Sequence, residues 1–344
     1  MSLTPVVIIG ASGYTGEELV RLTLRHPHLQ LQAVTSRQNA GELLERKIPA
    51  LPRKTDLRFS NPHLDELAHL ASVFFLAVPH GLAAEYAVPL IQMGKIVIDL
   101  SADFRLREAA RYEAFYGHPH PAPSLLSQAC YALPEIRREM IPQYNLLAAP
   151  GCYPTSILLP LVPLLRRKLI EANSITITSA SGVSGAGKKA DLAYLFGEVN
   201  ENFRAYGLPL HRHVSEIEQE LSLAAEENVC VTFIPHLAPW HRGIWTTIVV
   251  MLKANVSEAE IHAAYERDYT SEPFISVMRA TEVMPDMRNV QRTNRAEIAW
   301  HLDSRTGRLI VFSTIDNLGK GAASQAIQIL NCRMGWPETT GLEG

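Results

Sequence analysis

Near the N-terminus, a short β-branched run leads directly into three evenly spaced glycines. Residues 6–9 are followed by Gly10, Gly13 and Gly16, and a helical pattern then covers residues 17–24. Glycines at such a turn allow a tight reversal and let backbone N–H groups approach a pyrophosphate, which a helix N-terminus also attracts. The spacing differs from G-x-G-x-x-G because Ser12 takes the place of the second glycine. The position directly after a strand favours a dinucleotide-binding turn over a tight turn without a ligand.

The second apolar run, residues 29–34, ends in Thr35, Ser36 and Arg37. A site for NAD places an acidic residue at this point, where it accepts hydrogen bonds from the ribose hydroxyls. Here a hydroxyl and a guanidinium stand instead, and both are suited to a 2′-phosphate. The alternative is an arginine that is simply solvated. Ser36 and Arg37 therefore predict NADP(H) as the cofactor.

The pattern of the chain predicts an α/β protein of two domains, as its 344 residues also suggest. Strand-like and helical runs alternate up to residue 100, which is typical of a parallel, doubly wound Rossmann-type sheet. After residue 151, longer β-rich runs predict an α+β domain with a mainly antiparallel sheet. We expect a dinucleotide-binding domain over residues 1–150, joined by a C-terminal helix over 318–344, and a catalytic domain over 151–317.

Cys152 is the strongest candidate for a nucleophile. It stands between Gly151 and Tyr153-Pro154 and opens an apolar, helix-like segment. Because Pro154 suits a first helical turn, the cysteine is expected just ahead of the helix or at its start. The partial positive charge there stabilises a thiolate and lowers the pKa of the thiol. The other three cysteines are expected to be structural, as a lone cysteine usually is.

A thiolate nucleophile needs a group that manages protons. His211, Arg212 and His213 lead into a helical pattern over residues 214–226. One histidine is a candidate general acid and base, and Arg212 is a candidate for holding an anion. The alternative is an ordinary polar loop that enters a helix. Two other histidine pairs, His26 with His28 and His118 with His120, have no third residue that could complete a metal site, so we expect no metal.

Two glycine-containing loops add further candidates. Residues 182–188 nearly match G-x-x-x-x-G-K-[ST], but Lys189 replaces the hydroxyl residue that holds magnesium. This departure argues against a nucleotide-triphosphate site and leaves an anion-friendly loop. Residues 317–322 end the last strand and open the last helix, where backbone N–H groups face outward.

Charge and cysteine content exclude several classes of function. The net charge is −3 and no block of like charge dominates any stretch, so we expect neither a nucleic-acid partner nor a membrane partner. The four cysteines have neither metal-type nor disulfide-type spacing. Such sparse use is typical of a reducing compartment, and we expect a cytoplasmic protein.

Taken together, these motifs resemble the N-acetyl-gamma-glutamyl-phosphate reductases over nearly the whole chain. One departure is Ser215, where members of this family often have proline. The segments that carry the resemblance are residues 10–16, 99–105, 150–155, 181–188, 211–213 with Glu216 and Ile217, and 317–322.

The resemblance implies an NADPH-dependent reduction of N-acetyl-5-glutamyl phosphate to the 5-semialdehyde, with release of phosphate, through a thioester on Cys152. It implies His213, with His211 as the rival, as acid and base, and Arg105 and Arg212 as ligands of the substrate. The expected cofactor-binding residues are Gly10, Ala11, Ser12, Gly13, Tyr14, Thr15, Gly16, Ser36, Arg37, Pro79, Ser181, Gly182, Gly185 and Asn317.

We expect a homodimer or homotetramer with a small acyl phosphate as its substrate. Three alternatives remain at this point. The first is another semialdehyde dehydrogenase, of the aspartate-semialdehyde or glyceraldehyde-phosphate type, which shares the thioester scheme. The second is a regulator that senses NADP(H) without turnover and needs no reactive thiol. The third is a phosphate-loop kinase or ATPase built on residues 182–188.

Overall fold

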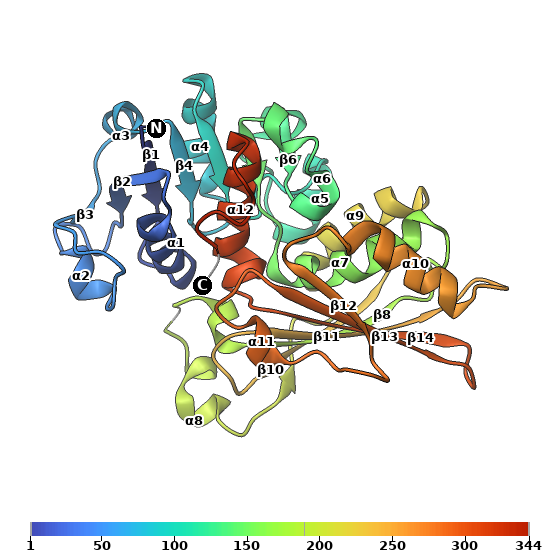
Figure 1. The fold of residues 1–344 in the computed structure, drawn as a ribbon. Coiled ribbons are helices and arrows are strands. Elements are labelled where there is room, and N and C mark those ends of the chain that lie inside the picture. The colour runs from blue at the N-terminus through green and yellow to red at the C-terminus, as the bar shows by residue number, and fades with distance from the viewer. Residues whose placement is uncertain (1, 189, 343–344) are drawn as a thin grey trace. The chain divides into compact units, whose positions relative to one another are not determined.

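The structure is a computed structural model that describes residues 2–188 and 190–342. The chain forms two compact units, which are described separately: residues up to Pro150 together with the chain from Ala322, and Gly151–Gly321. Each unit contains a seven-stranded sheet (Figure 1). Within the described ranges, no helix combines the length and the apolar character needed to cross a bilayer.

The sheet of the first unit is entirely parallel, with the order β3-β2-β1-β4-β5-β7-β6. The chain runs from β1 outward through β2 to β3 and then returns to β4 on the other side of β1. This reversal creates the switch point at which doubly wound sheets bind ligands. The Rossmann-type prediction is confirmed. The strands are β1 (Thr4–Ile9), β2 (Leu29–Thr35), β3 (Phe59–Ser60), β4 (Val73–Leu76), β5 (Ile96–Asp99), β6 (Ala129–Tyr131) and β7 (Leu146–Ala148).

Helices cover both faces of this sheet because alternate side chains of its buried strands point to opposite sides. In β1, Val6 and Ile8 pack in a core with α1 and α12, whereas Val7 and Ile9 pack in a second core with α3 and α4. The helices of this unit are α1 (Tyr14–Arg25), α2 (Leu44–Lys47), α3 (Leu64–Leu70), α4 (Ala83–Gln92), α5 (Ala109–Tyr116), α6 (Pro134–Arg137) and α12 (Ser324–Met334).

The C-terminal helix is shorter than the range 318–344 that the sequence predicted. A π-helical turn, Gly319–Ala323, precedes α12, and the helix ends at Met334 because Gly335 takes a left-handed conformation with φ of 69°. The buried face of α12 contributes Ile327 and Leu330 to the core that contains Val6.

The sheet of the second unit is mixed and mainly antiparallel, as predicted. Its order is β12-β13-β14-β11-β8-β10-β9, and only the pairs β8–β10 and β12–β13 are parallel among the described strands. Three of its strands, β9, β12 and β13, were not predicted from the sequence. The strands are β8 (Thr176–Gly182), β9 (Arg204–Ala205), β10 (Thr232–Ala238), β11 (Ile244–Met251), β12 (Ile275–Arg279), β13 (Ala296–Asp303) and β14 (Arg308–Ile315).

One face of the second sheet is covered by α7, which packs on β11 and β14, while α9 and α10 pack against α7 (Figure 1). Burial alternates along β11, so the opposite face presents half-buried side chains such as Trp245 and Val249. The helices are α7 (Cys152–Arg166), α8 (Phe196–Val199), α9 (His213–Ala225), α10 (Glu258–Tyr269) and α11 (Met287–Val290).

Two prolines, Pro160 and Pro163, lie inside α7. A proline has no N–H, so Pro163 leaves the carbonyl of Leu159 without its helical donor. The Tyr269 hydroxyl donates to that carbonyl instead. The Tyr265 hydroxyl donates to the carbonyl of Pro160 at 2.9 Å. Side chains of α10 thus support the backbone of the helix whose first residue is Cys152.

Candidate functional site

Cys152 is the first residue of α7, as the sequence predicted, and Gly151 is its N-cap. The thiol takes part in no disulfide and is half-buried. At this position the partial charge of the helix end favours an anionic sulfur over a neutral one. The first turn is held in place by buried hydroxyls, since Ser156 Oγ lies 2.8 Å from Thr246 Oγ1 on β11, which lies 2.8 Å from Ser179 Oγ on β8.

Glu216, in the first turn of α9, ties that helix to the start of α7. Its Oε1 accepts a hydrogen bond from the Gly151 N–H at 2.8 Å, and its side chain is only 2% exposed. Residues three apart on a helix share a face, so Glu216 and His213 lie on the same side of α9. Sequence reasoning noted Glu216 as a motif residue but gave it no role, because nothing in the sequence shows contact across 65 positions.

His213 is the first residue of α9, and His211 stands just ahead of that helix, with Arg212 between them as an αR N-cap. Their rings meet edge to face with centroids 4.9 Å apart. The His211 Nδ1 accepts from the His213 backbone N–H at 3.1 Å. Burial, with Arg212 next to it, lowers the pKa of His211 to about 4. His211 is therefore neutral near neutral pH and already engaged at one nitrogen.

Aromatic rings surround the histidine pair. The ring of Tyr153, the residue after Cys152, lies 5.6 Å from that of His211 and 5.9 Å from that of His213. Its hydroxyl lies 2.9 Å from the Tyr206 hydroxyl, and burial raises the pKa of Tyr153 well above its usual value. Tyr153 thus brings the start of α7 and the start of α9 together through neutral aromatic contacts.

The turn between β14 and α12 lies directly against Cys152. A Cβ placed on Gly321 would lie 2.8 Å from the Cβ of Cys152, so only glycine fits there. The buried carboxylate of Asp316 shapes this turn by accepting hydrogen bonds from the N–H groups of Leu318 and Gly319. Arg242 neutralises that carboxylate at 2.9 Å. Neither Asp316 nor Arg242 was singled out from the sequence.

Asn317 connects this turn with the loop after β8. Its amide nitrogen donates to Ser184 Oγ at 3.0 Å, and its oxygen accepts from the Gly243 N–H at 2.7 Å. Gly185 lies beside it, since a Cβ there would be 3.8 Å from the Asn317 nitrogen. Within the second unit, the structure therefore brings Asn317 and Gly185 into one cluster.

Ser181 and Gly182 belong to the end of β8, not to the loop in which the sequence placed them. Gly182 packs so tightly that a Cβ would lie 2.6 Å from the carbonyl oxygen of His241. The chain continues into a 3₁₀ turn, Val183–Ala186, rather than into the long helix that follows a phosphate loop. Lys189 lies outside the described residues. The kinase-type alternative loses its structural support.

The glycine turn of the first unit lies at the switch point between β1 and β4. Gly10 has φ of +85°, and a Cβ there would lie 2.5 Å from the Ala77 carbonyl oxygen; one on Gly16 would lie 2.6 Å from Ala11. Gly13, the N-cap of α1, has no atom near its missing Cβ. Two glycines therefore permit close packing, and the third leaves open space beside the N–H groups of α1. This arrangement fits a pyrophosphate. The expected contacts Ser12, Tyr14 and Thr15 are half-buried in the same turn.

Ser36 and Arg37 differ in how much they are available to a ligand. The Ser36 hydroxyl is buried and donates to Ser12 Oγ at 3.0 Å. The Arg37 side chain is 64% exposed and lies 3.6 Å from Glu85, a distance typical of a weak surface pair. Arg37 is thus available to an added anion, whereas Ser36 acts first as a support of the turn.

Pro79 is exposed and follows β4, opposite the glycine turn. Its loop is fixed by Asp103, whose carboxylate accepts hydrogen bonds from the N–H groups of Gly81 at 2.7 Å and Ala83 at 2.9 Å. Behind it, burial and the neighbouring Asp103 raise the pKa of Asp99 to about 7. Sequence reasoning quoted both aspartates only as part of a motif.

The two arginines expected at the substrate lie in different settings. Arg105 belongs to the first unit, is 6% exposed, and donates through Nε to the Ala149 carbonyl and through Nη2 to the Leu100 carbonyl. It also lines a pocket of about 430 Å³ together with Arg107 and Arg137. Arg212 belongs to the second unit and is exposed at the start of α9.

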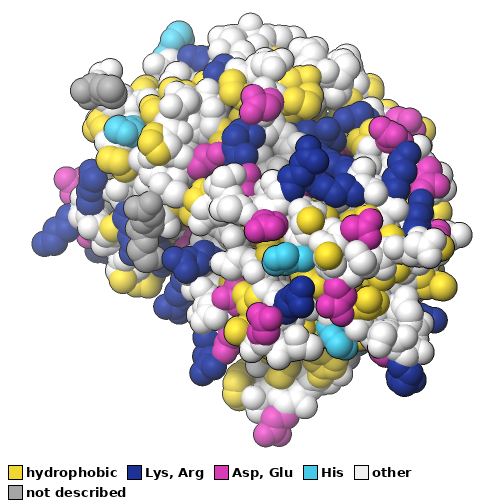
Figure 2. All heavy atoms as spheres, turned by 45° about the vertical axis from the view of Figure 1, so that its right-hand side comes forward, with side chains coloured by type: hydrophobic (Ala, Val, Ile, Leu, Met, Phe, Trp, Pro, Cys, Tyr) yellow, Lys and Arg dark blue, Asp and Glu magenta, His cyan; other side chains and the backbone are white. Residues whose placement is uncertain are grey.

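Basic and acidic side chains are intermixed over most of the face in Figure 2. Among the described residues, no three His, Cys, Asp or Glu side chains gather as ligands of a metal ion would.

Comparison with known families agrees with the two units. A family model described as the NAD binding domain of semialdehyde dehydrogenase matches residues 5–144. A second, described as the semialdehyde dehydrogenase dimerisation domain, matches residues 152–317. The first match indicates a nicotinamide dinucleotide as cofactor.

Curated relatives match over nearly the full length. A protein of Akkermansia muciniphila named N-acetyl-gamma-glutamyl-phosphate reductase is 47% identical, with 99% of each chain covered. The protein of that name from Desulfotalea psychrophila is 48% identical over 98% of this chain and 97% of its own.

Solved structures share the fold at low sequence identity. Aspartate semialdehyde dehydrogenase II of Vibrio cholerae, in complex with ASA, has a TM-score of 0.73 at 17% identity and covers 97% of this chain and 99% of its own. The Candida albicans aspartate semialdehyde dehydrogenase with NADP has a TM-score of 0.69 at 15% identity and covers 96% of this chain and 98% of its own.

Proposed function

The chain belongs to the N-acetyl-gamma-glutamyl-phosphate reductases within the semialdehyde dehydrogenases, and from this premise we propose its reaction. The protein is an NADP-dependent oxidoreductase that converts N-acetyl-5-glutamyl phosphate to N-acetylglutamate 5-semialdehyde and inorganic phosphate. The observation that carries this function is the position of Cys152, at the N-terminus of α7 and against the Gly321 turn.

Cys152 acts as the nucleophile. Its Sγ attacks the acyl carbon, the bond to the phosphate oxygen breaks, and inorganic phosphate leaves with the bonding electron pair. The thioester remains on Cys152. The N–H groups at the start of α7 are the natural donors to the oxyanion that forms during attack. Glu216 limits this choice, since it already accepts from the Gly151 N–H.

His213 is the group that we assign to proton transfer. His211 is the poorer candidate, because its Nδ1 accepts from the His213 backbone and its pKa is lowered to about 4. A useful acid and base has a pKa nearer the working pH. Reduction of the thioester gives a hemithioacetal, the precursor of the aldehyde, and His213 gives a proton to its oxygen. His213 takes that proton back as the carbon–sulfur bond breaks and the aldehyde forms. His211 holds the first turn of α9 in place.

The cofactor is NADP(H), which supplies the hydride that reduces the thioester carbon. Gly10, Gly13 and the N-terminus of α1 fit the pyrophosphate, and the exposed Arg37 is suited to the 2′-phosphate. No acidic residue stands after β2 to favour NAD. Pro79, on the loop that Asp103 fixes, borders the same turn of the first unit.

Arg212 and Arg105 are assigned to the anionic groups of the substrate. Arg212 is exposed next to the histidine pair, which suits an incoming carboxylate or phosphate. Arg105 already donates from two nitrogens to backbone carbonyls, so it contributes through its positive charge and its place in the 430 Å³ pocket.

We assign subunit contacts to the open face of the second sheet. Trp245, Val249 and Phe312 lie there half-buried, an apolar surface of the kind that paired subunits cover. The protein is therefore a homodimer or a homotetramer. None of its four cysteines forms a disulfide, and the reaction requires a reduced thiol, so the cytoplasm is its compartment.

The experiment that tests the proposed function follows NADP reduction with N-acetylglutamate 5-semialdehyde and phosphate, in wild type and in Cys152→Ala. The variant is expected to bind NADP as the wild type does and to lose turnover. Aspartate semialdehyde in parallel serves as the control substrate and is expected to react poorly. Turnover in Cys152→Ala, or a preference for aspartate semialdehyde, contradicts the proposal.

A further inference from the structure

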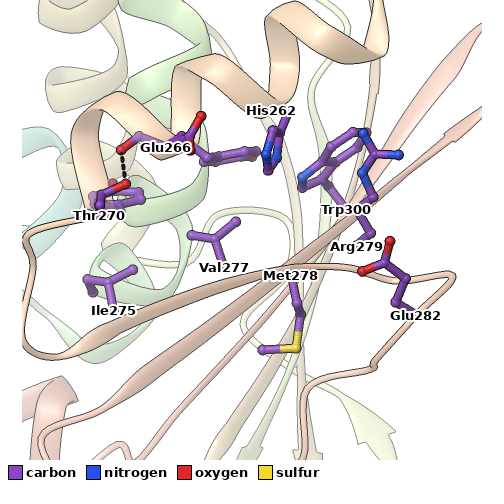
Figure 3. Close-up of a pocket in the computed structure, with 11 residues that line it drawn as sticks. His262, Glu266, Thr270, Ile275, Val277, Met278, Arg279, Glu282 and Trp300 are labelled. Carbon is purple, nitrogen blue, oxygen red and sulfur yellow. Dashed lines mark hydrogen bonds between the residues drawn. The ribbon is translucent and has the colours of Figure 1, made fainter.

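A second pocket lies within the second unit, between α10 and the edge strand β12. Its volume is about 580 Å³, which is in the range of small-molecule sites. Its floor consists of the buried residues Tyr265, Tyr269, Ile275 and Trp300. None of these residues belongs to the nucleophile, the histidine pair or the glycine turns. Figure 3 shows the lining side chains.

Trp300 supplies a hydrogen-bond donor that has no acceptor. Its side chain is 2% exposed, and its Nε1–H is buried without a hydrogen-bond partner in the described structure. In Figure 3 the indole lies at the edge of the pocket, with its nitrogen on the pocket side. Buried tryptophan N–H groups usually find a partner, because leaving one unpaired is costly. The donor therefore points to a ligand oxygen.

Arg279 marks the same end of the pocket as a place for an anion. Its guanidinium lies over the Trp300 ring, 5.3 Å from the centroid. It pairs only at 3.6 Å with Glu258, and both side chains are exposed, so this pair is weak. A carboxylate placed here receives a hydrogen bond from Trp300 and a charge-assisted one from Arg279.

Two carboxylates on the pocket wall, Glu266 and Glu282, have no cationic partner among the described residues. Glu282 follows β12 and lies beside Arg279, whereas Glu266 lies on α10, one turn beyond His262 (Figure 3). Arg279 is the one Lys or Arg among the described residues that line the pocket, so the lining is net negative. This balance favours a ligand with net positive charge.

The pocket is separate from the surface that we assign to subunit contacts. Trp300 pairs with Val311 on β14 and shares its face of the sheet with the buried Ile298, on the side that the helices cover. Trp245 points to the opposite, open face. A subunit seated on that open face leaves the pocket unfilled.

We propose that this pocket binds a basic α-amino acid, through a carboxylate held by Trp300 and Arg279 and cationic groups held by Glu282 and Glu266. The α-carboxylate of the ligand accepts a hydrogen bond from the unpaired Trp300 Nε1–H. The α-ammonium lies against Glu282, and the cationic end of the ligand's side chain reaches Glu266. Val277 and Ile275 contact the aliphatic chain.

The test measures binding by calorimetry to the full-length protein with four probes. L-Arginine and L-lysine carry all three groups, agmatine lacks the carboxylate, and L-norleucine lacks the side-chain cation. Saturable binding of at least one basic amino acid is expected, with both truncated probes weaker by about tenfold or more, since each loses a charge-assisted contact. Catalytic activity is not needed for this readout, so it is independent of the proposed reaction.

Two variants probe the two ends of the pocket. Trp300→Phe removes the N–H and keeps an aromatic ring, and Glu266→Gln removes an exposed charge with little risk to folding. Each is expected to weaken binding by about tenfold. The matched control is Trp245→Phe, on the open face, whose Nε1–H already donates to Thr247 Oγ1 at 3.2 Å. It is expected to bind as the wild type does.

Three results overturn the proposal. The first is the absence of saturable binding of both basic amino acids by the wild type in the millimolar range. The second is unchanged affinity in Glu266→Gln together with unchanged affinity in a folded Trp300→Phe. If Trp300→Phe does not fold, Glu266→Gln decides alone. The third is equal binding of agmatine or L-norleucine, which contradicts the assigned contacts.

Discussion

Adding one methyl group at Gly321 is the sharpest perturbation of the nucleophile that the structure offers. In Gly321→Ala the new Cβ would lie 2.8 Å from the Cβ of Cys152 and 3.2 Å from its Cα. Carbon atoms pack at about 3.5–4.0 Å, so the two segments must separate by roughly 0.7–1.2 Å. Neither contacted atom is the far end of a flexible side chain. The start of α7 therefore has to move.

A displacement of this size predicts a large loss of activity. Misplacing a reacting group by about 1 Å costs on the order of a hundredfold in rate, so kcat is expected to fall about that much. Overpacking also lowers stability by about 1–3 kcal/mol. NADP binding is expected to stay unchanged, because the glycine turn belongs to the first unit.

The assay compares steady-state rates, the rate of Cys152 alkylation and the thermal unfolding midpoint. The matched control is Gly197→Ala, because a Cβ at Gly197 meets nothing within 4 Å. It is expected to keep full activity. A folded Gly321→Ala with the activity of the wild type would falsify the reasoning that this turn positions the nucleophile.

Three further predictions concern protons and the cofactor. His213→Gln is expected to lose most of its turnover. His211→Gln removes a group whose pKa is about 4, so its pH–rate profile near neutrality is expected to stay unshifted. A shifted profile in His211→Gln would reverse the assignment of the two histidines. Arg37→Asp is expected to weaken NADP relative to NAD by about tenfold or more through loss of a charge-assisted contact, measured by direct binding; an unchanged ratio removes its role. Folding raises the pKa of Asp99 from 3.8 to about 7, so the native state holds that proton more tightly and the free energy of unfolding falls as pH rises between these values. In Asp99→Asn, the free energy of unfolding measured with denaturant should fall less steeply with pH over that window. An unchanged dependence on pH speaks against a raised pKa of Asp99.

Local patterns in the sequence were sufficient to predict the Rossmann-type sheet of the first unit and to place Cys152 at a helix start. Glycine spacing after a β-branched run is a short-range signal, because Gly10 takes a φ of +85° that favours glycine and Gly16 has no room for a Cβ. The placement of Cys152 at a helix start likewise follows from Gly151 and Pro154, its immediate neighbours.

Such local patterns could not predict contacts between segments that are distant in the sequence. Residues 275–279 and 296–303 become strands only through pairing with each other and with β14, and their outward side chains blur the apolar alternation. The helix expected to reach residue 344 ends at Met334, since one glycine in a left-handed conformation terminates it.

Short-range patterns predicted a parallel doubly wound unit, a mainly antiparallel unit and one cysteine at a helix start, because each is set by neighbouring residues. Three contacts became known only from the folded chain: Glu216 holds the Gly151 N–H, Gly321 lies against Cys152, and Trp300 keeps an unpaired N–H in a pocket. These contacts join residues far apart in the chain, and their energies depend on burial, which exists only after the chain has folded.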